Sequence, residues 1–267
     1  MQIRILGSIF AVLGLVAAAD LPDDVPVPET APREKAEQMP ESQPPQKKKV
    51  EPQHRPADEL KAIEPLDDAD VAATANPAPP PPNEAALAIC ESELKALGVK
   101  FKRRDAIDGP GPCGLSATYA ISTVAEDVEI SPTTEMTCAA ARATAEWVNK
   151  AVIPSVEALG ESVRLKRIRH ASTYVCRTRN GQPGAKISEH ARGSAIDISV
   201  FEFAGRDPIP VEPRAGKGTI EEAFQRAVRG SACLYFTTVL GPGSDAYHDD
   251  HLHLDLAERN RAYRLCQ

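Results

Sequence analysis

The sequence predicts an α+β domain, with a small antiparallel sheet and flanking helices, preceded by a disordered tail. Fifteen of the 24 prolines lie between Pro22 and Pro82, in a stretch without glycine, cysteine or aromatic residues. The chain after residue 83 holds all six cysteines and 11 of the 12 aromatic residues. In this second part, helical patterns come first and short strand patterns dominate later. The sequence therefore predicts one folded domain, residues 84–267, behind a long tail.

The first 19 residues have the layout of a secretory signal peptide. Arg4 precedes about 15 mostly apolar residues, and three alanines, Ala17 to Ala19, come before Asp20. An uncleaved membrane anchor is the alternative, but a spanning helix needs about 20 apolar residues. We expect cleavage after Ala19, a periplasmic or secreted protein, and no stable membrane span after cleavage.

Residues 20–83 read as a disordered, proline-rich acidic linker. They carry 14 acidic against seven basic side chains, and they have few large apolar groups to offset the entropy of ordering the backbone. A semi-stiff spacer is expected, with binding of an envelope protein partner or cell wall as the alternative. His54 in this segment is expected to be solvated. The whole chain has a net charge of −7, which argues against nucleic-acid binding.

Helix and strand patterns fill most of the remaining chain. Asn83 is a candidate N-cap for a helix that Gly98 ends, and Pro154 is expected to break or restart a second helix. Between these two helices lies a Gly/Pro-rich loop, residues 108–114. The expected helices are residues 83–97, 138–152 and 219–229, and the expected strands are residues 163–168, 172–176, 195–203, 235–240 and 251–256.

The six cysteines are expected to form three disulfides. Their number is even, no two form a Cys-x-x-Cys pair, and the predicted export places them outside the cytosol. Zinc binding by these thiols is a weaker alternative. Nearness along the chain is the only guide to the pairing, and it suggests Cys90–Cys113, Cys138–Cys176 and Cys233–Cys266.

Four of the six histidines lie in two short clusters. In the second cluster, residues 248–255, a strand would place His251, His253 and Asp255 on one face and leucines on the other. In the first cluster, residues 188–197, the same alternation buries isoleucines and turns Asp197 outward, and a bend at Gly193 could bring His190 beside it.

Imidazole nitrogen and carboxylate oxygen are zinc ligands, and a catalytic zinc site has three protein ligands and one open position. The two clusters together therefore predict a Zn²⁺ site, although polar residues on an exposed sheet face would give a similar pattern. The remaining histidine of the folded part, His170, is expected to be structural.

The two clusters also support a family resemblance. Ser188-x-His190-x-x-Gly193-x-Ala195-x-Asp197 followed by His248-x-x-His251-x-His253 resembles zinc D-Ala-D-Ala carboxypeptidases and murein endopeptidases. The stretch from Cys90 to Cys266 is similar to the bacterial extensin-like C-terminal domain family. Its supporting segments are residues 174–177, 188–191, 236–243 and 251–255.

The resemblance implies a Hedgehog/DD-peptidase-like fold and a set of residue roles. His190, Asp197 and His253 would be the zinc ligands, and Arg177 would lie near the scissile carbonyl. Ser188 would support the site by hydrogen bonds. His251 would be the general base or a hydrogen-bond donor to the transition state, with His248 auxiliary.

The sequence departs from the wider peptidase group in one respect, which leaves two candidates for the general base. Some relatives in the wider group place a glutamate shortly before the last histidine, and this sequence has none. The base is therefore either His251 or His248, and Asp249 and Asp250 are candidate orienting residues.

The sequence and the resemblance together predict an exported zinc metallopeptidase, either a carboxypeptidase or an endopeptidase. In such an enzyme a metal-activated water would hydrolyse an amide of a peptidoglycan stem peptide or cross-link. The main alternative is a catalytically inactive module on the same fold that binds peptidoglycan or an envelope partner. Capture of metal by the His248 cluster is a third hypothesis.

Overall fold

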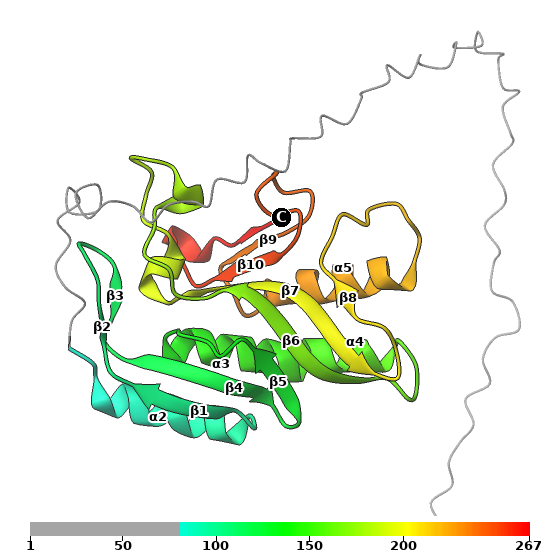
Figure 1. The fold of residues 1–267 in the computed structure, drawn as a ribbon, viewed down its shortest axis with the longest axis horizontal. Helices are drawn as coiled ribbons and strands as arrows, with labels where there is room; N and C mark the ends of the chain where they lie inside the picture. Colours follow the sequence, from blue (N-terminus) through cyan, green and yellow to red (C-terminus); the bar gives the residue numbers. More distant parts are fainter. Residues whose placement is uncertain (1–80) are drawn as a thin grey trace, which may run out of the picture. The chain divides into compact units, whose positions relative to one another are not determined.

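The computed structural model describes residues 81–267 (Figure 1). The predicted signal peptide, residues 1–19, and nearly all of the predicted linker, residues 20–83, lie outside the described residues. Among the described helices, none has the length and apolar character needed to cross a membrane.

A nine-stranded mixed sheet forms the centre of the domain, which confirms the α+β class but corrects the expected small antiparallel sheet. The strand order is β1-β4-β5-β6-β7-β10-β9-β11, with β8 paired to β7, and a separate pair joins β2 to β3. The bounds are β1 Lys100–Arg104, β2 Ile107–Asp108, β3 Gly114–Leu115, β4 Thr118–Ala125, β5 Val128–Ser131, β6 Arg164–Ser172, β7 Ala195–Ala204, β8 Ile209–Pro210, β9 Thr238–Leu240, β10 Leu252–Asp255 and β11 Leu265–Cys266.

Two strand pairs, β5 with β6 and β9 with β11, are parallel. Parallel neighbours need a long connection, and a helical segment joins β5 to β6. The segments 100–104, 118–125 and 128–131 were not expected as strands. β1 is mostly charged, and β4 is buried at all but one position, so neither shows the apolar and polar alternation of a half-buried strand.

Three helical segments pack beside the sheet: α2 (Glu84–Ala96), the continuous run of α3 (Cys138–Trp147), η2 (Val148–Val152) and α4 (Ile153–Glu157), and α5 (Ile220–Ala232). The Asn83 side chain accepts a hydrogen bond from the amide of Ala86 at 3.1 Å, as a helix N-cap does. Gly98 follows with a φ of +77°, a backbone conformation that favours glycine. Pro154 does not interrupt this run. The α-helix restarts at Ile153 after the π-helical segment η2, with Pro154 in the first turn of α4, which is one of the two expected outcomes.

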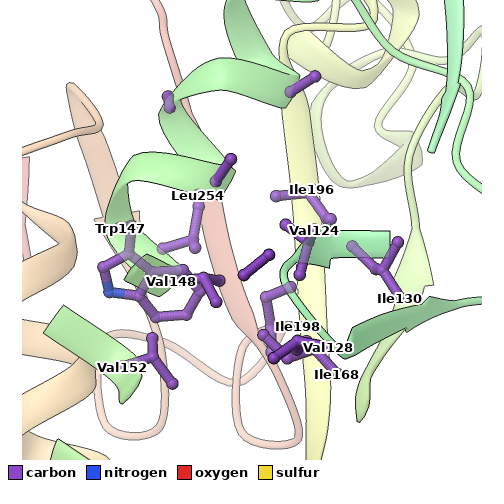
Figure 2. Close-up of a cluster of buried hydrophobic side chains, with 14 of the residues drawn as sticks. Val124, Val128, Ile130, Trp147, Val148, Val152, Ile168, Ile196, Ile198 and Leu254 are labelled. Carbon is purple, nitrogen blue, oxygen red and sulfur yellow. The ribbon is translucent and has the colours of Figure 1, made fainter. Parts of the chain in front are cut away.

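The core explains how the strands present their polar residues. Figure 2 shows Trp147 from α3 beside Leu254 from β10, and Ile196 and Ile198 from β7 belong to the same cluster of buried side chains. Ile196, Ile198, Leu252 and Leu254 have no exposed surface. Because side chains alternate along a strand, burial of these residues turns the intervening side chains of β7 and β10 to the opposite face.

All six cysteines form disulfides, but two of the three expected pairs are wrong. The bonds are Cys90–Cys138, Cys113–Cys176 and Cys233–Cys266. Because helix α2 packs against α3, Cys90 lies next to Cys138, which is 48 residues away along the chain. Of the three pairs predicted from nearness along the chain, only Cys233–Cys266 is present. Three disulfides suggest an extracytoplasmic domain.

Candidate metal centre

His190 enters the centre from a short 3-10 helix, η4 (Glu189–Arg192). The Ser188 hydroxyl caps this helix by accepting a hydrogen bond from the amide of His190 at 3.3 Å. Gly193 ends the helix with a φ of +61°, and the chain then turns directly into β7. A side chain at position 193 would collide with Leu115. The tight bend expected at Gly193 is therefore present, and it places His190 beside β7.

Asp197 and His253 face each other across two adjacent strands. Antiparallel β7 and β10, side by side in Figure 1, pair Asp197 directly with His253 in their register. Oδ1 of Asp197 lies 2.9 Å from Nδ1 of His253 and 3.2 Å from Nε2 of His190. The two imidazole nitrogens are themselves 3.2 Å apart.

These three atoms form a triangle of the size that a zinc ion needs. Ligands that lie about 2.0–2.1 Å from a tetrahedral zinc are separated from one another by roughly 3.3–3.4 Å. The observed separations of 2.9 to 3.2 Å are within half an ångström of that spacing. His190, Asp197 and His253 are therefore a group that could hold a metal ion.

Second partners fix which nitrogen of each imidazole faces the centre. The carbonyl oxygen of Thr173, which can only accept, lies 2.5 Å from Nδ1 of His190, so this nitrogen carries the proton and Nε2 is left as a ligand. Nε2 of His253 donates to Oδ2 of Asp255 at 2.9 Å, which directs Nδ1 to the centre. Oδ1 of Asp255 accepts from the amide of Ala257 at 2.9 Å. Such outer partners are typical of metal-binding histidines.

The charges of the group hold it together without an ion. Burial would raise the pKa of Asp197, but the hydrogen bonds and charges of His190 and His253 outweigh burial and hold this pKa well below its usual range. Burial would lower the pKa of His253, but the hydrogen bonds that its ring donates to Asp197 and Asp255 raise it to about 9. A metal ion, which also favours a carboxylate, would displace the proton on Nδ1 of His253.

The two remaining histidines of the second cluster lie at the edge of the centre, each next to a carboxylate. Nδ1 of His251 lies 2.8 Å from Oδ1 of Asp250, and its Nε2 lies 3.6 Å from Oδ1 of Asp197. Nδ1 of His248 lies 2.7 Å from Oδ1 of Asp245. Burial lowers the pKa of His248, against the opposing effect of Asp245.

A cavity of about 450 Å³ opens over these residues and is lined by every residue expected to bind the metal, to catalyse or to support the site through Ser188. Arg177 lines it together with Ser188 and the four clustered histidines. In the part of the chain that the structure describes, the Arg177 guanidinium pairs with no carboxylate, and its hydrogen bond is to the neighbouring Thr178 carbonyl. Tyr247 lies at the mouth, where its hydroxyl accepts from the Gln182 amide at 3.2 Å.

His170 lies elsewhere, as a structural residue would. Its Nε2 hydrogen-bonds the carbonyl oxygen of Pro132 at 2.6 Å. Burial lowers its pKa.

The sequence did not single out Asp245 or Asp255 as orienting residues. Asp250 does orient a histidine, as expected, but the partner of His248 is Asp245 rather than Asp249, which accepts from the amide of Gly243 at 3.4 Å. A carboxylate three residues before a histidine in a turn is a local signal that could have identified Asp245. Asp255 could have been found from its position two residues after His253 on the same strand face.

Comparison with known proteins identifies a family. The family model described as "Extensin-like protein C-terminus" matches residues 88–267, about two thirds of the chain. The chain matches no curated protein and no solved structure. The expected likeness to Hedgehog domains and DD-peptidases therefore stays a prediction.

Proposed function

The chain belongs to the extensin-like C-terminal family, and we propose that it is an exported zinc-dependent peptidase that hydrolyses an amide bond of peptidoglycan. The observation that carries the proposal is the convergence of His190, Asp197 and His253 on one point at the wall of an open cavity. Two imidazoles and one carboxylate are a ligand set of hydrolytic zinc enzymes, which leave one position for water or substrate. When bound, zinc would polarise the substrate carbonyl and make water a stronger acid.

His251 is best placed to move the proton. Its Nδ1 hydrogen-bonds Asp250, which leaves Nε2 of a neutral ring as an acceptor on the side of the metal centre, 3.6 Å from Oδ1 of Asp197. An imidazole in this position can take a proton from attacking water and return it to the leaving amine. Such general acid–base catalysis typically contributes about 10² to 10⁴ in rate.

His248 is the second proton-transfer group, held by a different carboxylate. Its bond to Asp245 fixes Nδ1 as the donor, and its ring centroid lies 5.2 Å from that of His251. A neutral His248, which its lowered pKa favours, can exchange a proton with His251 or with a substrate group. We assign it the auxiliary role.

Arg177 supplies the positive charge that stabilises the oxyanion formed from the amide carbonyl during hydrolysis. Its guanidinium lines the cavity, and among the described residues no carboxylate neutralises it. It is therefore available to hydrogen-bond the developing oxyanion, an interaction whose loss typically costs about 10² to 10³ in rate.

The choice of peptidoglycan rests on location and on the family resemblance. The disulfides and the predicted signal peptide favour an extracytoplasmic site of action, where the peptide stems and cross-links of the cell wall are an abundant amide substrate. A carboxypeptidase and an endopeptidase both fit this chemistry.

Digestion of purified peptidoglycan tests the proposal. Zinc-loaded protein should release new muropeptides, detected by liquid chromatography and mass spectrometry, and a chelator should stop the release until zinc is restored. Asp197→Ala should abolish zinc binding and cleavage together. His251→Ala should keep the zinc and lose about 10²-fold or more in turnover, whereas the neighbouring Asp249→Ala should behave like the wild type. If the zinc-loaded protein bound peptidoglycan without cleaving it, the domain would be a binding module and not an enzyme.

A further inference from the structure

A second cavity, of about 700 Å³, adjoins the metal centre and has no role in the chemistry described above. Arg179, Glu189 and Arg259 line both cavities. The elements between the cavities are those that carry the metal-ligand group. Glu189 and Arg192 of η4 line the second cavity, while His190 of the same helix turns to the metal centre. A ligand in the second cavity would therefore lie next to the reacting bond.

The charged side chains of this cavity are predominantly basic. Four cationic residues line it, Arg179, Lys186, Arg192 and Arg259, against the two carboxylates of Glu189 and Glu258. Glu189 is already engaged, because its Oε2 accepts from the Ser194 hydroxyl at 2.7 Å and its Oε1 lies 3.9 Å from Arg192.

Two of the cations are free to bind a ligand. Within residues 81–267, neither Arg179 nor Lys186 has a carboxylate within 4.0 Å, although their backbones are bonded to each other, the amide of Arg179 donating to the Lys186 carbonyl at 2.9 Å. That bond belongs to a hairpin-like loop, joined by an isolated bridge between Thr178 and Ile187, which holds both side chains at the wall of the cavity.

The rest of the lining is apolar or small, and it includes Ile187, Leu256 and Ala257. Leu256 and Ala257 directly follow β10, the strand of His253. A cavity with apolar walls and an excess of cations fits a peptide segment that carries a free carboxylate, since charged hydrogen bonds of Arg and Lys to carboxylates are the strong ones.

We propose that this cavity is a substrate subsite that binds a carboxylate of the peptide, on one side of the bond that is cut. The proposal rests on the proposed function. It assigns to Lys186 and Arg192, which line only this cavity, a role in substrate affinity rather than in the chemical step. Interactions made equally in the ground state and the transition state change KM and leave kcat unchanged.

The test compares two double variants that reverse the same number of charges. Lys186→Glu/Arg192→Glu alters the subsite, and Lys100→Glu/Lys102→Glu alters two exposed lysines of β1, away from both cavities. Each protein is assayed in its zinc-loaded form on muropeptides with free carboxylates and on the same muropeptides after conversion of the carboxylates to amides.

We expect the subsite variant to raise KM for the free-carboxylate muropeptides about 10-fold or more, with kcat within about 2-fold of the wild type. It should also lose most of the wild-type preference for free over amidated muropeptides, which the control variant should retain. An unchanged KM and preference in the subsite variant would overturn the proposal.

A binding measurement separates this proposal from the proposed function. Fluorescence anisotropy with a labelled free-carboxylate muropeptide gives a dissociation constant that does not depend on cleavage. If the wild type cleaves nothing, a dissociation constant raised about 10-fold in the subsite variant would still support the subsite. Equal dissociation constants in the wild type and the subsite variant would refute it.

Discussion

Nε2 of His253 donates a 2.9 Å hydrogen bond to Oδ2 of Asp255, on the ring edge opposite the one that faces Asp197. The two residues lie two positions apart on β10, so the alternation of a strand places both on one face. Asp255 is buried, and its second oxygen is held by the amide of Ala257. The hydrogen bond thus fixes the orientation of a proposed zinc ligand from a rigid element.

This arrangement predicts that Asp255→Ala weakens zinc binding about 10- to 100-fold, because the imidazole of His253 loses its orienting acceptor. Asp255→Asn keeps an acceptor and should lose less. Competition with a chromophoric chelator measures the affinity. Asp250→Asn, an exposed carboxylate at the edge of the site, is the control. Equal affinities in Asp255→Ala and the wild type would contradict the orienting role.

Removal of Asp245 should slow turnover without releasing zinc. The carboxylate contacts His248 at 2.7 Å and none of the three proposed ligands, so Asp245→Ala should reduce kcat about 10- to 100-fold with an unchanged zinc content. Muropeptide release and metal analysis measure the two quantities. Asp249→Ala changes a neighbouring carboxylate and should retain kcat. Loss of zinc in Asp245→Ala would show that Asp245 supports the metal centre itself.

Gly193→Ala should destabilise the fold by about 1–3 kcal/mol, because an alanine there must adopt a positive φ and displace Leu115. Gly184→Ala is a matched control, with a φ of +73° and open space around the added methyl. It should cost only about 1 kcal/mol, the backbone effect alone. Urea unfolding measures both. Equal losses in the two variants would show that the contact with Leu115 adds nothing.

The stability of the metal-free protein should depend on pH through the centre. His253 has a pKa raised to about 9 from 6.5, so its contribution is complete below pH 6.5 and is lost as the pH rises through 9. Asp197 has a lowered pKa, so its contribution is present above pH 3.8 and is lost at lower pH.

From these two groups, the free energy of unfolding should be highest between about pH 4 and 6.5 and should fall by no more than about 3 kcal/mol toward pH 9. Urea unfolding at a series of pH values in the presence of a chelator measures this profile. The variant His253→Gln should lack the alkaline decline. A decline of the same size in His253→Gln would assign it to other groups.

The metal-ligand group could be predicted from the sequence because local rules determine most of it. Leu252 and Leu254 are buried, so strand alternation turns His253 toward the cavity, and the same rule turns Asp197 out from between Ile196 and Ile198. Gly193 indicated the bend that brings His190 beside Asp197.

Long-range packing could not be predicted in the same way. The bond between Cys90 and Cys138 depends on how α2 packs against α3, and the parallel pairing of β5 with β6 depends on the helical segment that crosses between them. β1 lies at the edge of the sheet with four of its five side chains exposed, so its sequence shows no alternation of apolar and polar residues.

Zinc titration by calorimetry, with the metal-free wild type and Asp197→Ala compared at the same pH, tests whether the three side chains bind the ion. We expect one tightly bound zinc per chain in the wild type and no comparable binding in the variant. An equal stoichiometry and affinity in the two proteins would show that His190, Asp197 and His253 do not hold the ion.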